Sequence, residues 1–97
     1  MRLRVLGCDG GRGIGYYATG LLFDDCYLVD AGTVLSALTL DEALRITDVF
    51  LTHCHLDHLC ELPFLLDAPV ARRQQPLRIH AQRHTLDAMM THLFNDV

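Results

Sequence analysis

The chain has 97 residues, of which 51% are hydrophobic and 21% charged, a composition typical of a soluble globular protein that argues against disorder. Its formal net charge is −4 and it has no basic block, although all eight basic residues are arginine, so we expect no nucleic-acid-binding patch. No apolar stretch approaches the ~20 residues that cross a bilayer, and the start lacks the apolar core of a signal peptide, so we expect a cytoplasmic protein with no membrane contact.

The first third of the chain predicts three strands. Residues 3–6 form an apolar run that glycine halts, as suits a first strand. The glycine-rich segment 10–15 fits neither the dinucleotide-binding pattern nor a phosphate-binding loop, so we interpret it as a flexible connection. Residues 21–24 and 27–29 are separated by Asp25-Cys26, and this tight spacing predicts a β-hairpin.

A short helix and a buried strand are predicted next. Thr39 and Glu42 have the spacing of a capping box, which predicts a helix over about residues 41–45. Residues 48–52 form the next strand. They are apolar at three successive positions, as expected for a strand that is covered on both faces in a layered α/β arrangement.

The second half predicts two helices with a strand between them. Leucines recur at helical spacing over residues 59–66, with Pro63 as an interruption near the first turns. Residues 68–76 contain two prolines and predict a loop, and residues 77–79 alternate as a short strand. An apolar stripe marks a final helix and is assigned to core packing: Leu86, Met89, Met90, Leu93 and Phe94.

This order of elements predicts an α/β fold with α+β type layers, in which a mixed sheet carries helices on one face. We expect residues 1–97 to form a single domain. Strands this apolar need cover on both faces, whereas three short helices supply only one layer. The second face is therefore expected to be bare, which would invite a homo-oligomer or cover by a missing carboxyl-terminal half.

The most informative segment is Thr52-His53-Cys54-His55-Leu56-Asp57-His58, which follows the predicted strand directly. Three imidazoles and one carboxylate fall within six consecutive positions. Imidazole and carboxylate are the usual ligands of zinc, iron or manganese, and a turn after a strand can aim neighbouring side chains into one pocket. Metal binding is the leading hypothesis, and a merely His-rich polar loop is the alternative.

This cluster, together with Asp30-Ala31-Gly32-Thr33, resembles the metallo-β-lactamase superfamily, and most closely its class II cyclic nucleotide phosphodiesterases. Residues 6–11 resemble the opening strand and loop of that branch, and residues 93–97 resemble a helix end within it. Glu61 departs from the branch, which usually has a small residue there. The resemblance implies the amino-terminal half of an αββα sandwich with two divalent metal ions at one edge, zinc first, with manganese or iron as alternatives.

The resemblance also implies roles for individual residues. His53 and His55 would hold the first metal, and Asp57 with His58 the second, Asp57 being the residue assigned to catalysis. Asp30 would orient the His loop by hydrogen bonds, its alternative being a simple turn aspartate that ends a strand. A third His for the first metal, a bridging Asp and a last His lie farther along the family's chains and are not identifiable here. We therefore expect an amino-terminal portion of a hydrolase with an incomplete active site.

The implied function is metal-dependent hydrolysis of a small-molecule phosphodiester, such as a cyclic nucleotide. Two cations ~3.5–4 Å apart can share a water and lower its pKa toward ~7, which makes hydroxide available at neutral pH. Two alternatives stay open. One is a non-catalytic metal-binding fragment, and the other is a superfamily hydrolase acting on a thioester, a lactam or an RNA phosphodiester.

Other metal-ligating side chains are given simpler interpretations. The four cysteines form no C-x-x-C pair and are predicted to be free thiols. His80 and His84 could bind one metal at i,i+4 spacing only if both lay in one helix. Glu61 is interpreted as an exposed first-turn helix residue rather than a general acid or base. A structural zinc site is the weakest option, because its ligands would be crowded: Cys54, His55, His58 and Cys60.

Overall fold

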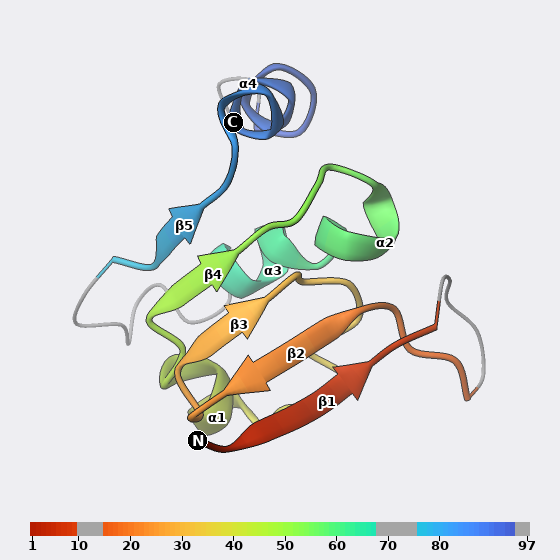
Figure 1. The fold of residues 1–97 in the computed structure, drawn as a ribbon, viewed down its shortest axis with the longest axis vertical. Coiled ribbons are helices and arrows are strands. Elements are labelled where there is room, and N and C mark those ends of the chain that lie inside the picture. The colour runs from red at the N-terminus through yellow and green to blue at the C-terminus, as the bar shows by residue number, and fades with distance from the viewer. Residues whose placement is uncertain (10–14, 68–75, 95–97) are drawn as a thin grey trace.

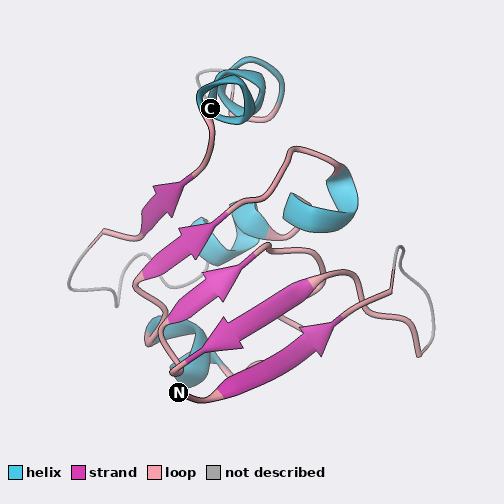
Figure 2. Ribbon diagram, viewed as in Figure 1, coloured by secondary structure: helices cyan, strands magenta, loops and turns pink. Residues whose placement is uncertain are grey.

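The computed structural model describes residues 1–9, 15–67 and 76–94. Its five strands form one mixed sheet in chain order (Figures 1 and 2). The first three strands are antiparallel, and the last three run parallel to one another. The elements are β1 (Leu3–Gly7), β2 (Gly20–Phe23), β3 (Tyr27–Val29), α1 (Leu40–Leu44), β4 (Asp48–Phe50), α2 (Leu56–Leu59), α3 (Leu62–Asp67), β5 (Arg78–His80) and α4 (Arg83–His92).

This arrangement confirms the predicted α/β class and the mixed sheet. The glycine-rich segment at 10–14, the predicted loop at 68–75 and the chain end at 95–97 lie outside the described residues. Among the residues that the structure covers, no helix is long and apolar enough to cross a membrane.

The hairpin between β2 and β3 forms because two aspartates accept a left-handed backbone. Asp24 and Asp25 have φ values of 50° and 62°, and the Cys26 amide donates to the Phe23 carbonyl at 3.1 Å. Two successive positive φ values match a type I′ turn, whose twist suits the strands that it joins. The short polar side chain of aspartate tolerates this conformation better than most residues do. The predicted hairpin is confirmed.

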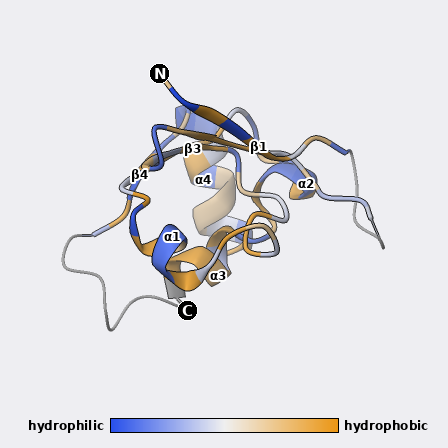
Figure 3. Cartoon of the chain, turned by 90° about the horizontal axis from the view of Figure 1, so that it is seen from below, coloured by the Kyte–Doolittle hydropathy of each residue, from blue (hydrophilic) through white to orange (hydrophobic). Residues whose placement is uncertain are grey.

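One face of the sheet packs against the helices. Leu22, Leu28 and Val49 are register partners on β2, β3 and β4, and all three side chains are buried. Figure 3 shows the sheet edge-on with α1 and α3 on one side of it. Side chains alternate between the two faces of a strand, so this register places the core between sheet and helices.

The opposite face carries apolar side chains that no described element covers. Leu3, Val5, Tyr27 and Phe50 lie on it and are between 39% and 56% exposed. The Phe50 ring also stacks on the His80 ring, with 4.5 Å between centroids. The predicted bare face is therefore confirmed, and it has the composition of a surface that packs against another layer.

The helix α1 begins where its capping box predicts. Thr39 caps it, since its hydroxyl accepts from the Glu42 amide at 3.1 Å while the Glu42 carboxylate accepts from the Thr39 amide at 2.9 Å. Two of the amide groups that a helix start leaves unpaired are thereby satisfied. The local signal was sufficient because both partners lie within one turn.

Three expectations for the second half of the chain need correction. Strand β4 ends at Phe50 rather than residue 52, because the Thr52 amide turns to the Asp30 carboxylate at 2.9 Å. The helical segment after the cluster is split at residues 60–61, and Pro63 falls inside the first turn of α3, where proline is tolerated. Met90 is 62% exposed, so only part of the predicted α4 stripe packs in the core.

Two carboxylates tie the sheet to its neighbours, and the first is Glu42. The backbone N–H of Thr39 and then the Arg4 guanidinium lower the pKa of Glu42 from 4.5 to about 2. Arg4 lies on β1 and also donates to the Ala37 carbonyl at 2.9 Å. These contacts connect the edge strand to the start of α1 through a charged group.

The second is Asp48 at the start of β4. Its carboxylate accepts from the Thr47 hydroxyl at 2.7 Å, and it contacts His80 Nε2 at 2.7 Å and Arg78 Nη2 at 3.0 Å. The Thr47 hydrogen bond, then those of His80 and Arg78, lower the pKa of Asp48 from 3.8 to about 2. The carboxylate thus links β4 to β5.

We predict that the folded state loses stability in acid through these two groups. Their folded pKa values lie below the ordinary values of 4.5 and 3.8, so the unfolded chain takes up protons first as pH falls. Their stabilisation is complete above about pH 5 and is lost as pH falls toward about 2. Urea unfolding midpoints across this range should decline, and should decline less steeply for Glu42→Gln. Equal midpoints at about pH 5 and about pH 3 would contradict the prediction.

Candidate metal centre

The candidate site lies where two neighbouring parallel strands end. Asp30 follows β3 directly, and Thr52 and His53 lie just past the end of β4. The carboxyl ends of parallel strands meet at one edge of a sheet, which is where α/β proteins commonly bind ligands. The Asp30 amide donates to the Phe50 carbonyl at 2.8 Å and so continues the pairing of the two strands to this edge.

The four predicted metal ligands form one chain of contacts at this edge. The His53 ring lies 4.6 Å from the His55 ring and 4.0 Å from the His58 ring, measured between centroids. His58 Nε2 lies 3.4 Å from a carboxylate oxygen of Asp57. His55 occupies the N-cap position of α2 without a side-chain capping bond, and this turn brings His58 back against His53. The imidazoles are gathered together rather than splayed apart.

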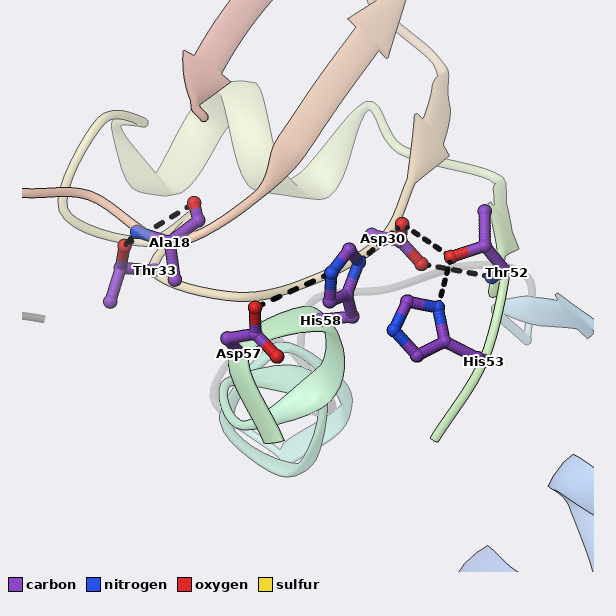
Figure 4. A network of polar contacts seen from close by, with 7 residues as sticks. All are labelled: Ala18, Asp30, Thr33, Thr52, His53, Asp57 and His58. Carbon is purple, nitrogen blue, oxygen red and sulfur yellow. Dashed lines mark hydrogen bonds and ion pairs between the residues drawn. The ribbon is translucent and has the colours of Figure 1, made fainter. Parts of the chain in front are cut away.

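The Asp30 carboxylate takes part in three hydrogen bonds with residues of the cluster (Figure 4). One of its carboxylate oxygens accepts from the Thr52 amide at 2.9 Å. The other accepts from the Thr52 hydroxyl and contacts His58 Nδ1, both at 2.8 Å. The residue is only 2% exposed and has a φ of 62°. These bonds join the ends of both strands to α2.

The same bonds fix which nitrogen of each imidazole is available. A carboxylate only accepts, so Nδ1 of His58 carries the proton that it shares with Asp30. The Thr52 hydroxyl donates its one proton to Asp30. In its contact with His53 at 2.9 Å the hydroxyl oxygen therefore accepts, and Nδ1 of His53 is the donor. In the neutral form of each ring Nε2 is then the nitrogen with the lone pair, the form in which imidazole binds a metal, and Nε2 of His58 faces the Asp57 carboxylate at 3.4 Å.

The loop that follows Asp30 is fastened to the helices of the site. The Ala31 amide donates to the His58 carbonyl at 2.6 Å, and the Glu61 amide donates to the Ala31 carbonyl at 3.0 Å. A Cβ on Gly32 would stand 2.4 Å from the Asp57 carbonyl oxygen, so this close approach requires glycine. The Ala18 amide donates to the Thr33 hydroxyl and anchors the loop on its other side (Figure 4).

The chemistry of the donor set fits divalent transition metals. Imidazole nitrogens and a carboxylate suit zinc, and also iron or manganese. Within the described ranges, however, no three His, Cys, Asp or Glu side chains stand where they could hold one ion together. Asp57 and His58 contact each other instead. The chain thus brings together part of a ligand set and orients it.

Two residues around the site were not predicted to act there. Thr52 has no role assigned from the sequence, although its hydroxyl contacts both Asp30 and His53 and its place between a strand end and a histidine is a usable signal. Glu61 was interpreted as exposed, and this is wrong: it is 8% exposed, and its carboxylate accepts from the Leu35 amide at 2.9 Å. An acidic residue in a helical stretch gives no sequence signal of such burial.

The alternative metal pairs gain no support from the geometry. His80 lies in strand β5, so it cannot pair with His84 across a helical turn. The Cys60 thiol donates to the Gly32 carbonyl at 3.3 Å, and Cys54 is exposed. All four cysteines lie in the described part of the chain, and none of them forms a disulfide.

Comparison with known proteins connects this geometry to a family. A family profile described as class-II cAMP phosphodiesterases matches residues 22–97. The crystal structure of the metallo-β-lactamase fold protein YhfI from Bacillus subtilis is 29% identical, with a TM-score of 0.78 over 92% of this chain. The crystal structure of human tRNase Z, short form, is 26% identical, with a TM-score of 0.74 over 99% of this chain. A search of curated proteins gave no match.

The chain spans 39% of the length of the first of these structures and 40% of the second. The matched region contains the strand ends, the His cluster and the loop that fastens them. The resemblance seen in the sequence is confirmed both by the family profile and by the fold. The chain belongs to the class-II cAMP phosphodiesterases, a hydrolase family with the metallo-β-lactamase fold.

Proposed function

We propose that the protein is a metal-dependent phosphodiesterase that acts on a cyclic nucleotide or a related small phosphodiester. The observation that carries the proposal is the Asp30 network, which engages Nδ1 of His58 directly and Nδ1 of His53 through Thr52, and so orients both rings at one edge of the sheet. Family membership supports the choice of a phosphodiester.

His53 and His55 are proposed to hold one divalent ion, and Asp57 and His58 a second. Zinc is the first candidate, followed by manganese and iron. Bound ions would supply Lewis acidity and a water acidic enough to attack at neutral pH. The remaining ligands are proposed to come from outside this span, either from a further part of the chain or from a second copy, because no described residues complete the set.

The chain's own residues have separate tasks in this proposal. Asp30 and Thr52 hold the imidazole protons at Nδ1, so the rings meet a cation as neutral ligands. Asp57 brings a negative charge beside His58 and so balances part of the charge of the ions. None of these steps needs a serine or cysteine nucleophile.

The test is hydrolysis of bis-p-nitrophenyl phosphate and cyclic AMP by the full-length protein, with and without Zn²⁺ or Mn²⁺. We expect metal-dependent turnover that falls by at least about 10²-fold in His53→Ala. His92→Ala is the matched control, because His92 is an exposed imidazole on α4 outside the cluster, and it should leave turnover unchanged. Binding of two metals without hydrolysis of any phosphodiester, thioester or lactam would overturn the enzyme assignment.

A second candidate substrate is an RNA phosphodiester, favoured by the similarity to human tRNase Z. The net charge of −4 opposes it, because RNA binding draws most of its affinity from basic side chains near phosphates. A structured RNA with a 3′ extension belongs in the same assay. Cleavage of the RNA in preference to cyclic AMP would replace the first candidate with this one.

A further inference from the structure

Glu61 is a buried carboxylate that the proposed chemistry does not use. Among the described residues, five polar or charged side chains are buried, and four of them lie elsewhere or are already placed: Asp30, Thr33, Asp48 and Thr85. Glu61 lies between α2, which carries Asp57 and His58, and α3. Burying a carboxylate is unfavourable unless hydrogen bonds compensate it, so the contacts that Glu61 makes bear on its role.

The Glu61 side chain reaches across to the loop that follows Asp30. Its Oε1 accepts from the Leu35 amide at 2.9 Å. A hydrogen bond to a charged acceptor is about twice as strong as a neutral one. This bond joins the far end of the Asp30 loop to the junction of α2 and α3.

The near end of the same loop is already joined to that junction through the backbone. The Ala31 amide bonds the His58 carbonyl, and the Ala31 carbonyl accepts from the Glu61 amide. Glu61 therefore contacts the loop at two points, with its amide at Ala31 and its carboxylate at Leu35. A loop held at both points leaves Asp30 little freedom to move away from His58.

We propose that Glu61 is a positioning residue that keeps the Asp30 carboxylate on Nδ1 of His58 and so prepares Nε2 of His58 for a metal. It touches neither the metal nor the substrate and acts through Asp30 and His58. The proposal rests on the proposed metal centre for its consequence, but the positioning can be measured without metal.

The test compares Glu61→Ala with Glu61→Gln in the full-length protein. The amide oxygen of glutamine can still accept from Leu35, whereas alanine cannot. In metal-free protein, ¹⁵N shifts of the His58 ring report its tautomer. We expect one tautomer in the wild type and in Glu61→Gln, a mixture in Glu61→Ala, and faster amide exchange at Leu35 in Glu61→Ala alone.

Zinc titration then measures the consequence, at a temperature at which every variant is folded by circular dichroism. We expect roughly tenfold weaker binding in Glu61→Ala and recovery to within about threefold in Glu61→Gln, since outer partners of metal ligands commonly contribute 10–100-fold. The matched control is Glu42→Ala, which removes another carboxylate that accepts a backbone N–H at 2.9 Å but lies on α1. It should leave zinc affinity and the His58 shifts unchanged.

The outcomes separate the two claims. An unchanged His58 tautomer in Glu61→Ala, an equal defect in Glu61→Gln, or an equal defect in Glu42→Ala would each overturn the positioning role. If the wild type binds no zinc while Glu61→Ala still mixes the tautomers of His58, the proposed metal centre fails and the positioning role stands.

Discussion

Replacing Asp30 with alanine is expected to weaken zinc binding by roughly 10–100-fold and to abolish measurable phosphodiester hydrolysis. The substitution removes the acceptor of three hydrogen bonds at once, two from Thr52 and one from His58. Both imidazoles then lose the group that keeps their protons at Nδ1. Isothermal titration with Zn²⁺ and the phosphodiesterase assay measure the two effects.

Stability should fall in the same variant. Leaving the partners of a buried carboxylate without an acceptor costs about 1–3 kcal/mol in the free energy of unfolding. The left-handed backbone of Asp30 adds to this cost, because alanine tolerates a φ of 62° less well than aspartate does. Urea unfolding of the metal-free protein measures the loss.

Two milder variants show whether the network acts as described. Asp30→Asn keeps the shape but turns one acceptor into a donor, which should clash with the Nδ1 proton of His58 and lower zinc affinity nearly as much. Thr52→Val keeps the Asp30–His58 contact and removes the hydroxyl's bonds to Asp30 and to His53, so it should cause a smaller loss. Wild-type affinity in Asp30→Ala would show that the network does not prepare the ligands.

The second large effect is expected from Gly32→Ala. The added Cβ would stand 2.4 Å from the Asp57 carbonyl oxygen and 2.6 Å from the Ala18 Cβ. Two of the contacting atoms, the Asp57 carbonyl oxygen and the Ala18 carbonyl carbon, are backbone, so we expect α2 to shift and to carry the proposed ligands away from His53. Overpacking of this kind costs about 1–3 kcal/mol in the free energy of unfolding, and we also expect zinc affinity to fall at least about tenfold.

Gly15→Ala is the matched control for this substitution. Gly15 has a φ of 79° and nothing within 4 Å of an added Cβ, so alanine there is strained by roughly 1–2 kcal/mol without touching the site. The two variants should unfold at similar urea concentrations, while only Gly32→Ala loses zinc. Equal zinc affinity in both would contradict the assigned role of the close approach.

Local signals explain the features that could be predicted from the sequence. The capping box at Thr39 and the hairpin at Asp24 and Asp25 depend on partners a few residues away. The proposed ligands His53 to His58 could be singled out as a cluster because they are adjacent in the chain, and their roles as ligands stay predictions. The bare face was predictable from the imbalance between apolar strands and few helices.

What could not be predicted depends on neighbours far along the chain. Strand β4 ends early because the Thr52 amide donates to the carboxylate of Asp30, which lies 22 residues earlier in the chain. Glu61 is buried, and its carboxylate accepts from the Leu35 amide 26 residues away, a partner that local sequence cannot reveal. Met90 is apolar yet exposed, and helical periodicity alone cannot show where the covering layer ends.

X-ray absorption at the zinc edge of the zinc-loaded full-length protein tests the central claim most directly. That claim is that the turn after β4 presents imidazole nitrogen and carboxylate oxygen to a divalent ion. The account predicts a shell of nitrogen and oxygen with the outer scattering of imidazole rings, reduced in His53→Ala. Zinc–sulfur scattering at ~2.3 Å, or a zinc shell without imidazole, would contradict it.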